Sequence, residues 1–71
     1  MDNTERRKTL GMNIRKARLA QGMSQRQLAE IANVAQSYLA EVELGRRSIG
    51  FDKLCQLSDS LDISIEDLVR K

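Results

Sequence analysis

Apolar side chains recur at intervals of three and four residues along almost the whole chain, and no proline interrupts them. This spacing gathers the apolar residues on one face of a helix and differs from the alternation that a strand requires. Gly22, Asn33 and Gly45 interrupt the pattern, and these residue types commonly end helices in the left-handed conformation. The sequence therefore predicts an all-α protein built from short helices.

These three interruptions and the serine at position 64 together predict five helices. The expected helices begin near residue 4 or 5, after Ser24, at about residue 36, after the loop 46–50 and after Ser64. Ser24 with Gln27 and Ser64 with Asp67 have the spacing of capping boxes, in which a side chain and a backbone amide cap each other. Gly11 lies inside the first helix, where glycine lowers helix stability, and we interpret it as a site of close packing.

The composition restricts the chemistry. With 71 residues the chain has room for a single domain, 1–71. One cysteine, Cys55, excludes an internal disulfide, and the absence of histidine removes the usual zinc sites and histidine-dependent catalysis. The carboxylates Glu66 and Asp67 lie on a capping turn without catalytic partners. We expect a cytoplasmic protein that is not an enzyme, binds no metal or cofactor, and carries neither a signal peptide nor a membrane segment.

Positive charge is concentrated at one end of the chain. The net charge is +2, and residues 1–22 carry six basic and two acidic side chains, so the remainder is net negative. This distribution allows the basic end to face phosphate groups, although a solvated helix face gives the same pattern. Charge alone does not separate the two interpretations.

The expected third helix has two different faces. At about 100° per residue, its small and polar positions fall on one side together with Leu44, and its other large apolar positions fall on the opposite side. The first group is Gln36, Ser37, Ala40, Glu41 and Leu44, and the second is Tyr38, Leu39 and Val42. A helix held by one face and presenting the other fits a major groove roughly 12 Å wide.

Residues 24–47 resemble the helix-turn-helix of the Cro and phage-repressor (XRE) family. The matching positions are Gln25, Leu28, Ala29, Asn33, Val34, Leu39, Val42, Glu43, Gly45 and Arg47. The resemblance extends over nearly the whole chain and implies a compact five-helix lambda-repressor-like domain, with the helix-turn-helix at about 24–45. It further implies a sequence-specific regulator of transcription that binds double-stranded DNA.

The resemblance also assigns roles to individual residues. The base-reading positions are Ala35, Gln36, Ser37 and Glu41, and the phosphate-binding positions are Gln25, Arg46, Arg47 and Ser48. Glutamine can pair with adenine, and a carboxylate can accept a hydrogen bond from cytosine. Arg18 and Glu43 match an ion pair that joins the first and third helices in related repressors.

Useful specificity requires two recognition helices on half-sites roughly 34 Å apart, which implies a homodimer on a near-palindromic operator. Ile63, Ile65 and Val69 offer apolar groups for a dimer surface at the C-terminal end. The chain also looks like the controller proteins of restriction-modification systems and like small prophage regulators. Whether it activates or represses, and whether it is instead an antitoxin, stays open, and no small-molecule ligand is evident.

Several residues depart from the family pattern. Ala35 stands where Ser or Thr usually caps the third helix, Asn33 replaces the turn glycine, and Ile49 replaces a common proline. The third helix also carries Glu41 and Glu43 without a basic residue, and phosphate would repel these carboxylates unless they are neutralised. The rival hypothesis is a protein-interaction module that keeps the same scaffold and binds a partner protein, such as a toxin or a regulatory subunit.

Overall fold

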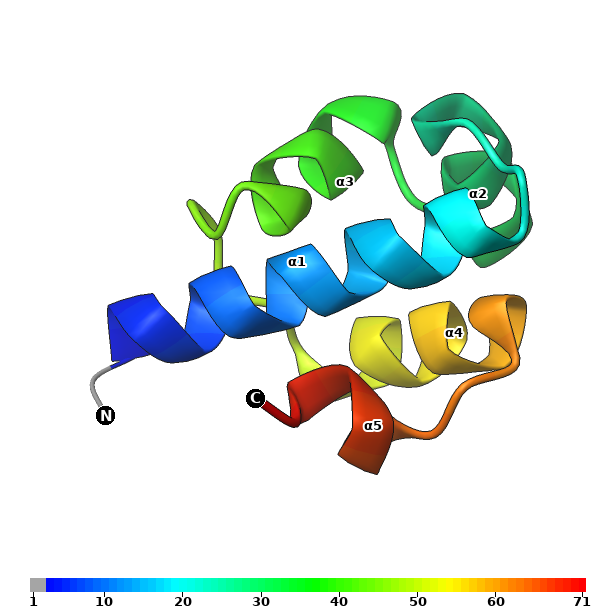
Figure 1. Cartoon of the computed structure of the whole chain (residues 1–71). Coiled ribbons are helices and arrows are strands. Elements are labelled where there is room, and N and C mark those ends of the chain that lie inside the picture. The colour runs from blue at the N-terminus through cyan, green and yellow to red at the C-terminus, as the bar shows by residue number, and fades with distance from the viewer. Residues whose placement is uncertain (1–2) are drawn as a thin grey trace.

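The computed structural model describes residues 3–71, which form five helices and no strand (Figure 1). They are α1 (Asn3–Ala20), α2 (Gln25–Ala32), α3 (Gln36–Glu43), α4 (Phe51–Leu61) and α5 (Ile65–Val69). The all-α prediction and the order of helices are confirmed. In Figure 1 the helix α1 crosses the middle of the molecule, with α2 and α3 above it and α4 and α5 below it.

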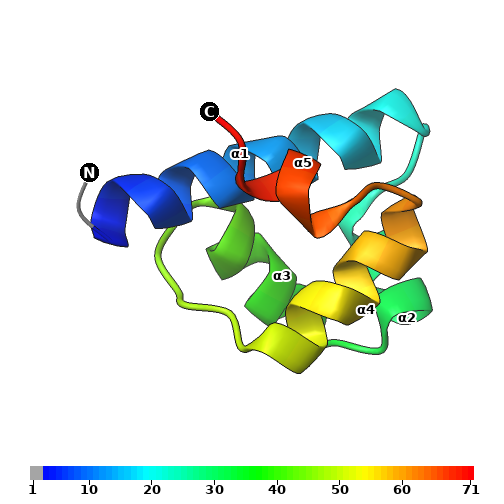
Figure 2. The same ribbon diagram turned by 90° about the horizontal axis from the view of Figure 1, so that it is seen from below.

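All five helices contribute to one core. Its fully or almost fully buried members are Ile14, Leu28, Ala29, Ala32, Leu39, Val42, Leu57, Leu61 and Leu68. The helix α1 packs against α3 and α5, and α2 packs against α3 and α4. The long α1 therefore holds the helix-turn-helix pair on one side and the C-terminal pair on the other (Figures 1 and 2).

The start and end of α2 confirm the expected capping. The Ser24 hydroxyl accepts a hydrogen bond from the Gln27 amide at 3.1 Å, and the Gln27 side chain accepts one from the Ser24 amide at 2.8 Å. At the other end Asn33 adopts a left-handed conformation with φ of 59°. The Val34 amide then donates to the Ala29 carbonyl oxygen at 2.9 Å, which closes the turn into α3.

The cap of α5 differs from its prediction. The Ser64 hydroxyl accepts a hydrogen bond from the Asp67 amide at 3.1 Å, as expected. The Asp67 carboxylate, however, pairs with Arg70 at 2.9 Å, so only the serine half of the predicted capping box is formed. The preceding helix α4 ends at Asp62, which has a φ of 53° and whose role the sequence pattern did not indicate.

Gly11 lies where α1 touches the end of α3. A Cβ atom built on Gly11 would overlap the carbonyl oxygen of Val42 and lie 2.6 Å from that of Glu43. Only a residue without a side chain lets the two backbones approach this closely. The prediction of a close-packing glycine is confirmed.

A buried ion pair joins the same two helices about two turns further along α1. Arg18 Nε donates to Glu43 Oε2 at 2.8 Å and Arg18 Nη2 donates to Glu43 Oε1 at 3.0 Å, a bidentate arrangement. Both residues are less than a tenth exposed. The hydrogen bond to Glu43 raises the pKa of Arg18, burial opposes that rise, and attraction to the Glu43 charge adds to it. Arg18 Nη1 also donates to the Met23 carbonyl oxygen at 2.9 Å, which ties in the segment before α2.

We predict that Gly11→Ala destabilises the protein. Alanine favours a helix by ~1 kcal/mol over glycine, but the steric overlap with the last turn of α3 should cost more, for a net loss of ~2 kcal/mol. Urea unfolding followed by circular dichroism measures the change. Gly50→Ala is the control, because a Cβ atom added to Gly50 would meet nothing within 4 Å, and its effect should stay below ~1 kcal/mol. Equal effects of the two substitutions would contradict the close-packing role.

We further predict a non-additive effect at the buried ion pair. Arg18→Met leaves the Glu43 carboxylate buried without its main partner and should cost ~3 kcal/mol or more. The double variant Arg18→Met/Glu43→Leu removes both charges and should be more stable than Arg18→Met alone. The same unfolding measurement applies, and a double variant that loses the sum of the two single effects would refute the prediction.

Candidate nucleic-acid interface

The helix α3 presents the polar face that the sequence predicted. Gln36, Ser37 and Glu41 are exposed, whereas Leu39 and Val42 are buried in the core. Ala35 occupies the N-cap position without a side-chain hydrogen bond, so the start of α3 lacks the usual cap. The predicted base-reading residues therefore lie together on the outer side and the free end of one helix.

Both glutamates of α3 are neutralised by arginines. Glu43 is buried against Arg18, and the exposed Glu41 pairs with Arg47 at 3.2 Å. The sequence placed no basic residue on this helix and left repulsion from phosphate as an objection. The three-dimensional structure answers it, because each carboxylate receives a cation from elsewhere in the chain.

Two cations lie over the ring of Tyr38. The Arg47 guanidinium carbon is 5.0 Å from the ring centroid, and Lys53 Nζ from the first turn of α4 is 5.4 Å from it. These distances are within the range of cation–π attraction. Burial raises the pKa of Tyr38 and the Arg47 charge lowers it, with burial the larger effect. Sequence reasoning missed Lys53, because only the folded chain brings the first turn of α4 to this ring.

The four predicted phosphate-binding residues do not gather in one place. Gln25 begins α2, and its Nε2 donates to Glu43 Oε1 at 3.1 Å, so this side chain is already engaged with the end of α3. The Arg46 side chain is exposed and has no partner among residues 3–71. Arg47 is held by Glu41 and Tyr38. Ser48 instead lines a hollow on the side facing α1 and α5.

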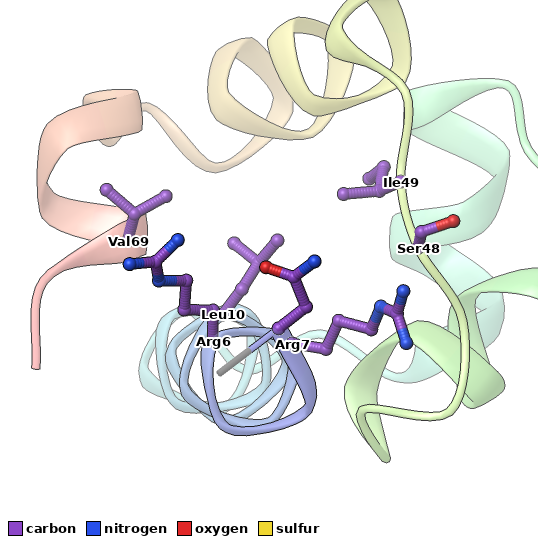
Figure 3. Close-up of a pocket in the computed structure, with 7 residues that line it drawn as sticks. Arg6, Arg7, Leu10, Ser48, Ile49 and Val69 are labelled. Atoms are coloured by element: carbon purple, nitrogen blue, oxygen red, sulfur yellow. The ribbon is translucent and has the colours of Figure 1, made fainter. Parts of the chain in front are cut away.

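That hollow lies between the N-terminal half of α1, the loop after α3 and the end of α5 (Figure 3). Val69, one of the three predicted dimer residues, is half exposed and forms part of its wall. Ile63 packs against the protein's own core and Ile65 is partly buried. The predicted dimer residues thus differ in how much apolar surface they offer to a partner.

Metal clusters and membrane spans are absent from the described part of the chain. Among residues 3–71 no group of three or more cysteine, aspartate or glutamate side chains is placed to hold a metal ion. Within the same residues no helix combines the length and the apolar character that a membrane span needs.

Comparison with known proteins identifies the scaffold. A helix-turn-helix family model matches residues 14–68. The restriction-modification controller protein C.AhdI from Aeromonas hydrophila is 32% identical with a TM-score of 0.84, and the match covers 87% of this chain and 94% of that one. The clp gene regulator ClgR from Corynebacterium glutamicum is 34% identical with a TM-score of 0.84, over 87% of this chain and 66% of that one.

A third structure, the hypothetical transcription factor NHTF from Neisseria, is 26% identical with a TM-score of 0.89, over 99% of this chain and 80% of that one. No curated protein sequence matches the chain. The family model spans well over half of the residues, and solved structures of regulators share both the fold and up to a third of the sequence. The chain therefore belongs to the XRE-type helix-turn-helix family of DNA-binding transcriptional regulators.

Proposed function

We propose that this protein is a transcriptional regulator that reads double-stranded DNA with α3 in the major groove. The observation that carries the proposal is the state of α3, which exposes a polar face while both of its carboxylates are paired with arginines. Such a face carries little net charge, and cations lie beside it. This combination suits a helix that must approach phosphates closely and then distinguish bases.

We assign base reading to the residues at the N-terminal end of α3. The side chains of Gln36 and Ser37 are exposed, have no hydrogen-bond partner among residues 3–71, and are free to face base edges. Ala35 precedes them and offers a methyl group for contact with thymine. Glu41 lies one turn further on; Arg47 bonds to its Oε1, and its Oε2 is left to accept from cytosine N4. Glu41 therefore has two roles in the proposal, holding Arg47 and reading a base.

Phosphate binding is assigned to the cations beside this face. Arg46 is unpaired within the described chain, and Arg47 and Lys53 converge on Tyr38. Gln25 stands at the start of α2, where free backbone amides and the helix dipole favour an anion. These groups position the protein on the DNA, and α3 supplies the sequence preference.

One recognition helix reads only a few base pairs, so we propose a homodimer that binds a near-palindromic operator in the cytoplasm. The similarity to C.AhdI favours a restriction-modification controller protein over the prophage-regulator and antitoxin alternatives. Because its relatives are regulators and no catalytic group stands out, the protein is proposed not to be an enzyme.

The rival hypothesis is a scaffold that binds only a partner protein. It predicts no salt-dependent affinity for DNA.

The proposed function predicts a sequence preference. Selection from a randomised duplex library should enrich one inverted repeat with the natural protein, and Gln36→Ala should relax the preference at one position of each half-site, by ~1 to 3 kcal/mol per contact. Sequencing of the retained DNA gives both results. Gln56→Ala is the matched control, since Gln56 is an exposed glutamine on α4. Lack of enrichment with the natural protein would favour the protein-partner hypothesis.

The proposed phosphate contacts predict a change in salt dependence. Replacing Arg46 by glutamine should weaken binding to all sequences alike and reduce the slope of log K against log salt by ~1 for each half-site occupied. Fluorescence anisotropy at a series of salt concentrations measures the slope. Arg70→Gln makes the same change in net charge beyond the end of α5 and should leave the slope unaltered. If both variants shift it equally, the effect comes from net charge and Arg46 is not a contact.

A further inference from the structure

A hollow of about 510 Å³ opens between three segments that are distant in the sequence. Leu10 from α1, Ile49 from the loop and Val69 from α5 supply its apolar surface, as Figure 3 shows. Leu10 and Ile49 are half-buried against the core, while Val69 is 51% exposed. The volume is that of a pocket able to enclose an apolar group.

Two arginines flank the hollow. In Figure 3 the side chain of Arg6 extends toward Val69, and that of Arg7 extends toward Ser48 on the opposite side. Neither arginine has an ion-pair partner among residues 3–71. An apolar surface between two free cations favours an occupant that combines an apolar group with a negative charge.

The chain itself carries such a group two residues beyond Ile49. Phe51 is 70% exposed, the highest value among the large apolar side chains that the structure describes. The next residue, Asp52, is exposed in the first turn of α4 and has no partner within residues 3–71. An aromatic ring and a free carboxylate thus stand side by side at the start of α4, close in sequence to the loop that borders the hollow.

We infer that the hollow is filled by Phe51 of a second copy of this chain, with Asp52 of that copy facing Arg6 and Arg7. A protruding group and a matching hollow on one surface are what a two-fold interface requires, because each copy then both gives and receives the contact. In this dimer the exposed Phe51 ring becomes buried, and the Asp52 carboxylate meets the arginines of the other copy. The inference rests on the proposed homodimer and places its centre at the hollow, with Val69 as part of the wall.

This assignment also fits the placement of the DNA-facing groups. The loop after α3 carries Arg46 and Arg47 and continues through Ile49 to Phe51, and Figure 2 shows it running from the end of α3 to the start of α4. A two-fold contact at this loop would set the α3 helices of both copies at a fixed separation. Dimer formation and operator spacing would then depend on the same short segment.

Sedimentation equilibrium of the full chain without DNA tests the role of Phe51 in the dimer. Phe51→Ala should raise the dimer Kd by ~100-fold, because each dimer loses the contact twice. Leu19→Ala is the matched control, a 53% exposed apolar residue on α1 that should leave the Kd unchanged. Both side chains are largely exposed, so thermal melts should confirm that the variants stay folded.

Exchanging the signs of the charges tests the pairing of Asp52 with Arg6 and Arg7 of the other copy. Asp52→Lys alone and Arg6→Glu/Arg7→Glu alone should each weaken the dimer by ~10-fold or more, since like charges then face each other. A one-to-one mixture of these two variants should form heterodimers more tightly than either variant pairs with itself, because both contacts then join opposite charges, one exchanged and one natural. A mixture no tighter than its components would overturn the inference, and so would a natural protein that stays monomeric at every concentration.

The outcomes separate this inference from the proposed function. If Phe51→Ala leaves the Kd unchanged while the natural protein still enriches an inverted repeat, the dimer uses another surface and the hollow is free for a small anionic molecule. That result would overturn the inference and leave the function standing. If the charge exchange restores the dimer but no DNA is enriched, the inference holds and the proposed function fails.

Discussion

The ion pair between Arg18 and Glu43 is the interaction on which the arrangement of the helices depends. Two charges buried this deeply are tolerated only with close partners, and here Met23 and Gln25 satisfy further hydrogen bonds of the same pair. The pair therefore connects α1, the segment before α2, the start of α2 and the end of α3. Because a bidentate contact fixes orientation as well as distance, it sets the direction in which α3 presents its polar face.

The close contact at Gly11 complements this electrostatic constraint with a steric one. The ion pair attracts the end of α3 to α1, and the missing side chain at Gly11 determines how near the two backbones come. Neither constraint alone defines the position of a helix only eight residues long. Together the ion pair and the close backbone contact fix the position of α3. They offset the stability that α3 loses because Ala35 leaves its N-terminus without a side-chain cap.

The helices, the buried residues and the Ser24 capping box were predictable because they depend on spacing within a few residues. The end of α4 at Asp62 was missed, since aspartate adopts the left-handed conformation less regularly than glycine or asparagine. The exposed polar face of α3 followed from helical geometry. The cluster of Glu41, Arg47, Tyr38 and Lys53 did not, because it joins residues from two helices and a loop whose relative positions are set only by packing.

This cluster changes how charge on the proposed binding face should be understood. A glutamate on a DNA-reading helix opposes binding when it is considered alone, yet Glu41 holds Arg47 over Tyr38 and so fixes a cation at the edge of that face. The cost of the negative charge is offset because an ordered arginine loses less side-chain freedom on contact with phosphate than a mobile one. An acidic residue in such a position can therefore favour DNA binding through the cation that it orients, and the net charge of a helix is a poor guide to what the helix binds.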